Sequence, residues 1–265
     1  MARVAAALTV LARALVGFVP ILVLLLGWEG LARSGLVTAF MLPSFGSVAT
    51  RIAHDAAAGD LAVNVALTLY RALTGFAIAA VGGIALGLAM SRNGGVRWFF
   101  DPLVSVGFPM PKISFLPIIV LWLGVYDVSK ISMVVFDAIF PVVTATIAGI
   151  AGVERELIWS ARNLGARERE LLWQVMLPAA LPQIMTGLQV ALPIALIVAV
   201  IAEMLMSGYG IGAAMLTASR FADSRGVFAG IVEIAVIGYA LVKGMALLRR
   251  HLLAWHAEAL EPITA

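Results

Sequence analysis

The stretch SARNLGARERELLWQVMLPAALP, residues 160–182, is charged and is interrupted by glycine and proline, whereas the segments around it are mainly apolar. Residues 152–170 hold eight charged side chains, a large share for a chain with 18 Lys and Arg and 15 Asp and Glu. The 265 residues are 62% hydrophobic and 12% charged, roughly half the charged fraction of a soluble domain. This composition predicts a membrane protein whose charged stretch lies outside the bilayer.

The composition also excludes several classes of site. The chain has no cysteine, which rules out a disulfide framework, a thiolate metal site and a cysteine nucleophile. The three histidines, His54, His251 and His256, are scattered, so we predict no metal site and no catalytic residue. The net charge is +3, but the basic residues flank apolar runs instead of forming one stripe. A membrane explains them better than a nucleic acid does.

Six apolar stretches are long enough to cross a hydrocarbon core of about 30 Å as helices. They span about 14–32, 65–90, 103–123, 131–151, 183–206 and 227–247. A cleaved signal peptide is the alternative for the first stretch, but the apolar run is too long and WEGLARSG is a poor cleavage site. We therefore predict an all-α, polytopic fold in a single domain, residues 1–265, with a loop at 152–182.

The distribution of Lys and Arg predicts the orientation, because cytoplasmic loops carry the excess. With the N-terminus inside, ten of these residues fall in the cytoplasm: Arg3, Arg13, Arg92, Arg97, Arg155, Arg162, Arg167, Arg169, Arg249 and Arg250. Five fall outside: Arg33, Arg51, Lys130, Arg220 and Arg225. We expect both termini in the cytoplasm, and with them the 152–182 loop.

This loop has the pattern of a helix-turn-helix elbow. Leu157, Ala161 and Leu164 recur at helical spacing, and Gly165 follows where a helix end needs a residue that tolerates left-handed geometry. A second helix can start in RERELLWQVMLP, and Pro178 and Pro182 should disturb it. The apolar residues of the elbow stay exposed unless another protein covers them, although a solvated loop would have similar charges.

The segment WSARNLGARERELLWQVMLP resembles the signature loop of ATP-binding-cassette (ABC) importer permeases: Glu-Ala-Ala, three residues, Gly, nine residues, Ile, one residue, Leu-Pro. The residues that match or border this motif are Trp159, Ser160, Ala161, Arg162, Leu164, Gly165, Ala166, Val175, Leu177 and Pro178. Trp159 and Ser160 replace the family's Glu and Ala, so a charged contact through that Glu is not expected here. The segments 109–130, 177–205 and 207–231 resemble the nitrate, sulfonate and taurine branch, and the resemblance covers about residues 60–255.

The resemblance implies a type I importer permease in the bacterial inner membrane. It implies a permease homodimer, two cytoplasmic ATPase subunits that each receive one elbow, and a periplasmic or lipid-anchored substrate-binding protein. The chain has no Gly-x-x-x-x-Gly-Lys-Ser/Thr segment, so ATP and Mg²⁺ are expected in the partner ATPase and no cofactor in this chain. The implied substrate is a small anion or organic acid such as a sulfonate, taurine or nitrate. Cyanate, aromatic acids and vitamin precursors are the alternatives within the family.

Four residues are candidates for the translocation path: Asp137, Pro141, Glu203 and Tyr209. An ionised side chain in a spanning helix costs about 2.5–3.5 kcal/mol, so each acid needs a partner or a function. Asp137 either contacts the substrate or is satisfied by a neighbouring helix or a lysine, and as a lone acid in the path it would suit a zwitterion better than a bare anion. For Glu203 we favour a structural pairing with a loop arginine over a place in the outer gate. Tyr209 lies in SGYGIG, residues 207–212, which is either part of the outer gate or a flexible loop.

Two other classes of function fit the sequence less well. A membrane-embedded enzyme would need a cluster of His, Asp or Glu on facing helices, and the predicted spans contain no histidine and only isolated acids. A secondary transporter usually has inverted repeats and an ion-coupling cluster, and we find neither. Neither class has a use for the elbow.

Overall fold

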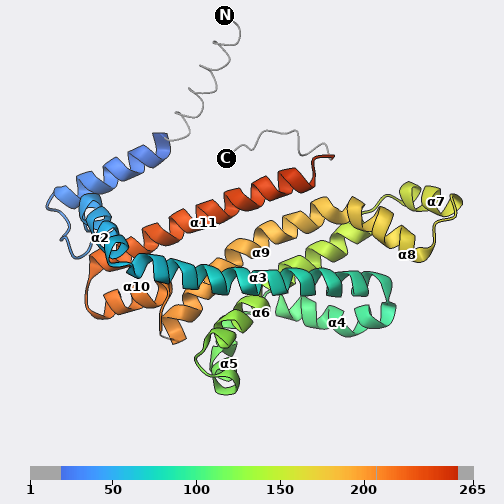
Figure 1. Cartoon of the computed structure of the whole chain (residues 1–265), viewed down its shortest axis with the longest axis horizontal. Coiled ribbons are helices and arrows are strands. Elements are labelled where there is room, and N and C mark those ends of the chain that lie inside the picture. Colours follow the sequence, from blue (N-terminus) through green and yellow to red (C-terminus); the bar gives the residue numbers. More distant parts are fainter. Residues whose placement is uncertain (1–18, 207, 256–265) are drawn as a thin grey trace, which may run out of the picture.

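The computed structural model describes residues 19–206 and 208–255, and every regular element within these ranges is a helix (Figure 1). Residues 19–33 are helical. The further elements are α2 (Phe45–Ala58), α3 (Asp60–Arg92), α4 (Gly94–Gly107), the 3₁₀ helix η1 (Lys112–Phe115), α5 (Leu116–Leu123), α6 (Asp127–Ala151), α7 (Arg155–Asn163), α8 (Glu168–Glu170), the π-helical turn η2 (Leu171–Met176), α9 (Leu177–Met206), α10 (Ile211–Arg220) and α11 (Ser224–Leu252). The all-α prediction is confirmed.

Four of the described helices are long and apolar enough to cross a membrane: Asp60–Arg92, Asp127–Ala151, Glu168–Met206 and Ser224–Leu252. They contain the predicted spans 65–90, 131–151, 183–206 and 227–247. The predicted span 14–32 begins outside the described residues, and its remainder lies in the helix over residues 19–33.

The third predicted span, 103–123, differs from the structure. Gly94–Gly107 and Lys112–Leu123 together are long enough for a span, but they are bent by 100° at a short break. The break contains Pro109 and Pro111, which have no amide hydrogen and cannot donate to the carbonyls four residues earlier. The chain therefore forms a broken span or a re-entrant loop here, and the prediction of one continuous helix over 103–123 is wrong.

The core of the bundle is made by α3, α6 and α9, which lie side by side (Figure 1). Glycines of α3 form a seam along α6: a Cβ on Gly75 would lie 2.5 Å from the Val134 side chain, and one on Gly87 would lie 2.6 Å from Thr146. Each glycine therefore lets the two backbones approach closely, which is how helices pack in lipid without a hydrophobic driving force.

The long α9 contains three prolines, Pro178, Pro182 and Pro193, and does not end at any of them. Sequence reasoning expected Pro178 and Pro182 to disturb the second helix of the elbow, but the helix from Glu168 to Met206 is continuous. The wide turn η2, directly before α9, already departs from the regular i→i−4 ladder, so the missing amide of Pro178 does not end the helix.

The elongated bundle has two distinct ends (Figure 1). We call them the α7 end, where α7 and α8 connect α6 to α9, and the α10 end, where α2, α10 and the start of α3 gather. Charged and polar groups concentrate at both ends and at the break between α4 and α5.

Candidate functional site

The elbow is the first candidate region, and it occupies the α7 end. After α7, Gly165 takes a left-handed conformation with φ 85°. The Gly165 N–H donates to Arg162 O (2.9 Å) and the Ala166 N–H to Ala161 O (3.0 Å), which closes the end of the helix. A carboxylate oxygen of Glu170 then accepts from the Arg167 N–H (2.8 Å) and caps the next helix. The expected helix, glycine turn and second helix therefore form as one compact unit.

The elbow buries one face and exposes another. Ile158 packs beside the buried residues Val153 and Ile184, and Leu171 is 1% exposed. By contrast, Leu164 is 87% exposed and Trp159 is 56% exposed. The sequence placed Leu157, Ala161 and Leu164 on the apolar face, but Ile158 is the residue that anchors the helix. An exposed apolar tip on an anchored unit is a surface that a protein partner can cover.

The remaining predicted elbow residues have different exposures. Ser160, Arg162 and Pro178 are exposed, whereas Ala161, Ala166, Val175 and Leu177 are partly buried. Arg162 is held by Glu168, with a distance of 3.0 Å between Nη2 and Oε1. Arg92, at the end of α3, also approaches Glu168 at 3.8 Å. The ion pairs therefore connect the two arms of the elbow to each other and to the bundle.

The second candidate region is an ion pair at the break between α4 and α5. Lys112 Nζ lies 3.0 Å from Asp137 Oδ1, and the two side chains are 6% and 24% exposed. The ammonium also donates to Phe108 O (3.1 Å) and lies 4.8 Å from the centre of the Phe140 ring. Asp137 is therefore no lone acid. Pro141 is buried one turn along α6.

The third candidate region is a buried polar network at the α10 end. Glu203 is 0% exposed and Arg71 is 4% exposed, and their side chains are joined by a 2.6 Å contact between Oε1 and Nη1. Thr68 donates its hydroxyl to Glu203 Oε2 (2.8 Å), and Arg71 also donates from Nε to Asp127 Oδ1 (2.8 Å). Glu203 thus pairs with an arginine of α3 instead of a loop arginine, and the network joins α3, α6 and α9.

The same network holds the turn between α9 and α10. Arg71 Nη1 donates to Tyr209 O (2.6 Å), while the Gly210 N–H donates to Asn64 Oδ1 (2.9 Å) and the Gly212 N–H to Glu203 Oε2 (3.1 Å). Gly210 has φ 124°, and a Cβ there would collide with the Glu203 carboxylate. The Tyr209 side chain is 71% exposed although its carbonyl is bound. Residues 208–212 are therefore tied to the bundle and are not a flexible loop.

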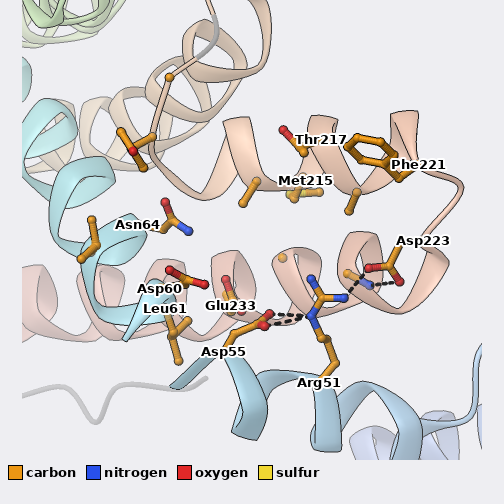
Figure 2. Close-up of a pocket in the computed structure, with 17 residues that line it drawn as sticks. Arg51, Asp55, Asp60, Leu61, Asn64, Met215, Thr217, Phe221, Asp223 and Glu233 are labelled. Carbon is orange, nitrogen blue, oxygen red and sulfur yellow. Dashed lines mark hydrogen bonds and ion pairs between the residues drawn. The ribbon is translucent and has the colours of Figure 1, made fainter. Parts of the chain in front are cut away.

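A cavity of about 440 Å³ adjoins this turn and has charged walls (Figure 2). Arg51 of α2 is hydrogen-bonded to Asp55 (2.8 Å) and to Asp223 at the start of α11. The Asp55 hydrogen bond raises the pKa of Arg51. Although partial burial opposes ionisation, the Gly226 N–H and Arg51 lower the pKa of Asp223 below its usual value. These contacts fasten α2 to the corner between α10 and α11.

The sequence analysis gave no role to two residues of these regions, Arg71 and Lys112, which lie in or at the edge of predicted spans. Arg71 is the centre of the α10-end network. Lys112 is the partner of Asp137. The sequence offered one clue to these roles. Two basic residues, Arg71 and Lys112, and two acidic residues, Asp137 and Glu203, lie in apolar stretches, where each charge needs an opposite charge nearby.

A comparison with protein families identifies the chain. The family described as "Binding-protein-dependent transport system inner membrane component" matches residues 79–253, which include α6, the elbow, α9 and all of α11. The chain belongs to this family. It is the permease component of an ABC importer, and ATP hydrolysis belongs to a separate subunit of such systems.

The permease is similar to curated proteins over most of its length. It is 32% identical to the taurine transport system permease protein TauC of Escherichia coli (strain K12), over 89% of this chain and 88% of that protein. A putative aliphatic sulfonates transport permease protein, SsuC of Bacillus subtilis (strain 168), is also 32% identical, with 86% and 83% covered. The riboflavin transport system permease protein RibX of Chloroflexus aurantiacus is 31% identical, with 90% and 89% covered.

Solved structures with the same fold are also transporter chains. A chain of the MetNI methionine ABC transporter in an inward-facing conformation aligns with a TM-score of 0.64 at 16% identity, covering 71% of the permease and 94% of that chain. An amino acid ABC transporter chain aligns with a TM-score of 0.61 at 17% identity, with 71% and 92% covered. At this identity the likeness concerns the fold, which confirms the type I importer architecture.

Proposed function

We propose that the permease forms the translocation path of an ATP-driven importer for a small anion or organic acid, with a sulfonate, taurine or nitrate as the substrate class. The observation that carries the substrate class is the similarity to TauC and to SsuC over most of the chain. Two charged pairs inside the bundle, Arg71 with Glu203 and Lys112 with Asp137, hold helices together, which suits a helical core for passage better than a covalent reaction.

In this proposal the elbow couples the permease to its ATPase. Two permease copies pair, and each inserts one elbow into a cytoplasmic ATPase subunit, where ATP and Mg²⁺ bind. The exposed Leu164 and Trp159 supply apolar contact, and the closed turn at Gly165 fixes the shape. Movement of the ATPase pair would then bias the bundle between inward-open and outward-open states.

The proposed orientation places the α7 end in the cytoplasm and the α10 end at the outer surface, with both termini inside. The excess of arginine in the segments predicted to be cytoplasmic, including Arg92, Arg155 and Arg169, supports it. A substrate-binding protein would then deliver its ligand at the α10 end, near Tyr209. Tyr209 belongs to the outer gate in this proposal, and the buried Glu203 has the structural role of holding the turn that the gate includes.

The decisive experiment is reconstitution of the permease in lipid vesicles with the ATPase and the binding protein encoded beside it. Uptake of labelled taurine, an alkanesulfonate and nitrate is measured with ATP and with a non-hydrolysable analogue. ATP-dependent uptake of one of these compounds supports the proposal, whereas uptake without hydrolysis, or no uptake of any of them, contradicts it.

Vitamin import is a second candidate, because the riboflavin permease RibX is nearly as similar as the sulfonate relatives. The same vesicles test it with labelled riboflavin, cyanate and an aromatic carboxylate. Uptake of riboflavin with no uptake of taurine or sulfonate would move the permease to this second class and leave the coupling mechanism unchanged.

A further inference from the structure

The break between α4 and α5 packs against the middle of α6, a helix long and apolar enough to cross a membrane. Asp137 is about 15 Å from the start of α6 at 1.5 Å per residue, and Lys112 reaches it from η1. Irregular backbone at membrane depth is tolerated only where protein buries it or where it lines a cavity. Discontinuous helices of this kind are frequent at transporter binding sites, because they present free backbone groups and charges to a substrate.

Lys112 is fully engaged at this break. Its ammonium has a carboxylate, a backbone carbonyl and an aromatic face as neighbours, from Asp137, Phe108 and Phe140. Only 6% of the side chain is exposed. A buried ammonium of this kind persists only with an anion beside it, so any substrate anion that binds Lys112 takes the place of Asp137.

Asp137 has more acceptor capacity than Lys112 uses. The structure gives its side chain one ionic partner within the described residues, and 24% of that side chain is accessible. Pro141 has no amide hydrogen, so the Asp137 carbonyl lacks the donor that a regular helix would supply. The Thr144 hydroxyl, one turn further, donates to Phe140 O and Pro141 O instead. The Asp137 carboxylate therefore has acceptor capacity left for an ammonium group.

We propose that Lys112 and Asp137 are the charge-selecting site of the translocation path, and that their ligand is a small zwitterion with an ammonium and a sulfonate or carboxylate group. The ligand's anionic group binds Lys112 while its ammonium binds Asp137, so the internal ion pair is exchanged for two intermolecular ones. The proposal rests on the proposed function and specifies the substrate class within it.

Charge balance explains the selection. A bare anion that displaces Asp137 from Lys112 leaves the carboxylate with no cation in a region of low dielectric, which is strongly unfavourable. A zwitterion leaves no charge unpaired. The site should therefore discriminate against a sulfonate that lacks an amine, even when size and shape are the same.

Taurine and ethanesulfonate provide a matched pair of probes, since they differ by the amine alone. Initial uptake rates of both are measured in vesicles with the same ATPase and the same binding protein. Because the binding protein is constant, a change in the ratio of kcat/KM values between permease variants reports on the permease. We expect Asp137→Asn to lower the taurine-to-ethanesulfonate ratio at least about tenfold, which corresponds to about 1.4 kcal/mol of lost discrimination.

Three further variants identify the cause of the change. Asp137→Glu keeps the charge and should restore most of the preference for taurine. Lys112→Gln should reduce uptake of both compounds, because both carry the sulfonate. Asp127→Asn is the matched control: this acid lies on the same helix and is also paired with a cation, Arg71, but at the α10 end, so the ratio should not change.

The outcomes separate this inference from the proposed function. If the unsubstituted permease takes up neither these two compounds nor nitrate in an ATP-dependent manner, the proposed function fails, whereas uptake of nitrate alone overturns only the zwitterion site. If it takes up taurine and the ratio is the same for Asp137→Asn as for the unsubstituted chain, the charge-selecting site is overturned while the importer stands. A ratio that falls equally in Asp127→Asn also overturns it, because the effect would then be a general response to lost charge.

Discussion

The elbow and the α10-end network are both rich in charge, but they use it in opposite ways. At the elbow, Arg162 and Glu168 form an ion pair with side chains that are 53% and 65% exposed. In the network, Arg71 and Glu203 are 4% and 0% exposed and make hydrogen bonds to three helices and a turn.

This difference shows how the surroundings decide the role of a charge. Water already solvates the elbow's charges, so they contribute little to stability and remain available to a partner. Arg71 and Glu203 are shielded from water, so each charge is stabilised mainly by its ion-pair and hydrogen-bond partners. These contacts fix the positions of α3, α6 and α9 relative to one another. Four substitutions test the contrast, in decreasing order of expected effect.

Glu203→Leu should have the largest effect. It leaves the buried Arg71 with the half-exposed Asp127 as its one remaining carboxylate among the described contacts, and breaking a buried pair in this way costs about 3–5 kcal/mol. The loss is measured as a fall in the unfolding temperature of the purified permease, followed by tryptophan fluorescence. Glu203→Leu combined with Arg71→Met should recover most of it, because an apolar pair of similar size needs no desolvation. Equal unfolding temperatures for Glu203→Leu and the unsubstituted permease would refute the structural role of the network.

Gly165→Val should have an intermediate effect that is confined to the elbow. A Cβ at Gly165 meets no atom within 4 Å, so the substitution acts only through the backbone, where φ is 85°. Left-handed geometry costs an L-residue about 1–2 kcal/mol, so the turn should open and the number of ATP molecules hydrolysed per substrate imported should rise. Gly165→Asn tolerates this geometry better and serves as the control. Unchanged coupling with valine would count against the elbow's role.

Asp223→Asn tests a pair of intermediate burial. The Arg51 and Asp223 side chains are 36% and 31% exposed, so the loss should be at most about 1 kcal/mol, and asparagine can still cap α11 at Gly226. The folded pKa of Asp223 lies below its usual value of 3.8, so this stabilisation is present above that pH and disappears as the pH falls through the folded value. The difference in unfolding temperature should therefore be seen at pH 7 and should vanish in strong acid. A difference that persists there would assign the effect to packing.

Glu168→Gln should have the smallest effect, below about 0.5 kcal/mol, because its pairs with Arg162 and Arg92 are exposed. High salt should remove even this difference from the unfolding temperature, since it screens exposed charges. If Glu168→Gln lowered the unfolding temperature as much as Glu203→Leu, the proposed difference between exposed charges at the elbow and buried charges in the network would be wrong.

The periodic and compositional parts of the fold could be predicted from the sequence. Apolar runs of 18 or more residues located α3, α6, α9 and α11, because lipid requires helices of that length. The turn at Gly165 was also predictable, since helix ends often need a residue with positive φ.

Features that depend on three-dimensional pairing could not be predicted. The partners Arg71 and Glu203 are 132 positions apart, and no local pattern joins them. The bend of 100° at Pro109 and Pro111 was missed because the stretch 103–123 is apolar enough overall to count as one span, although it contains Lys112. The opposite error occurred at Pro178, where a disturbed helix was expected but the helix continues. The π-helical turn before Pro178 allows this.

The absence of cysteine from the chain permits the most direct test of the central claim, that the exposed elbow is the surface that receives an ATPase. Leu164→Cys, at the 87% exposed tip, is labelled with a short photoactivatable cross-linker in membranes that contain the neighbouring ATPase. Val81→Cys, which is 72% exposed on α3 in a spanning segment, is the control. We predict an adduct with the ATPase from Leu164→Cys and none from Val81→Cys. If Leu164→Cys gives no ATPase adduct, or if both positions give it equally, the elbow is not the coupling surface.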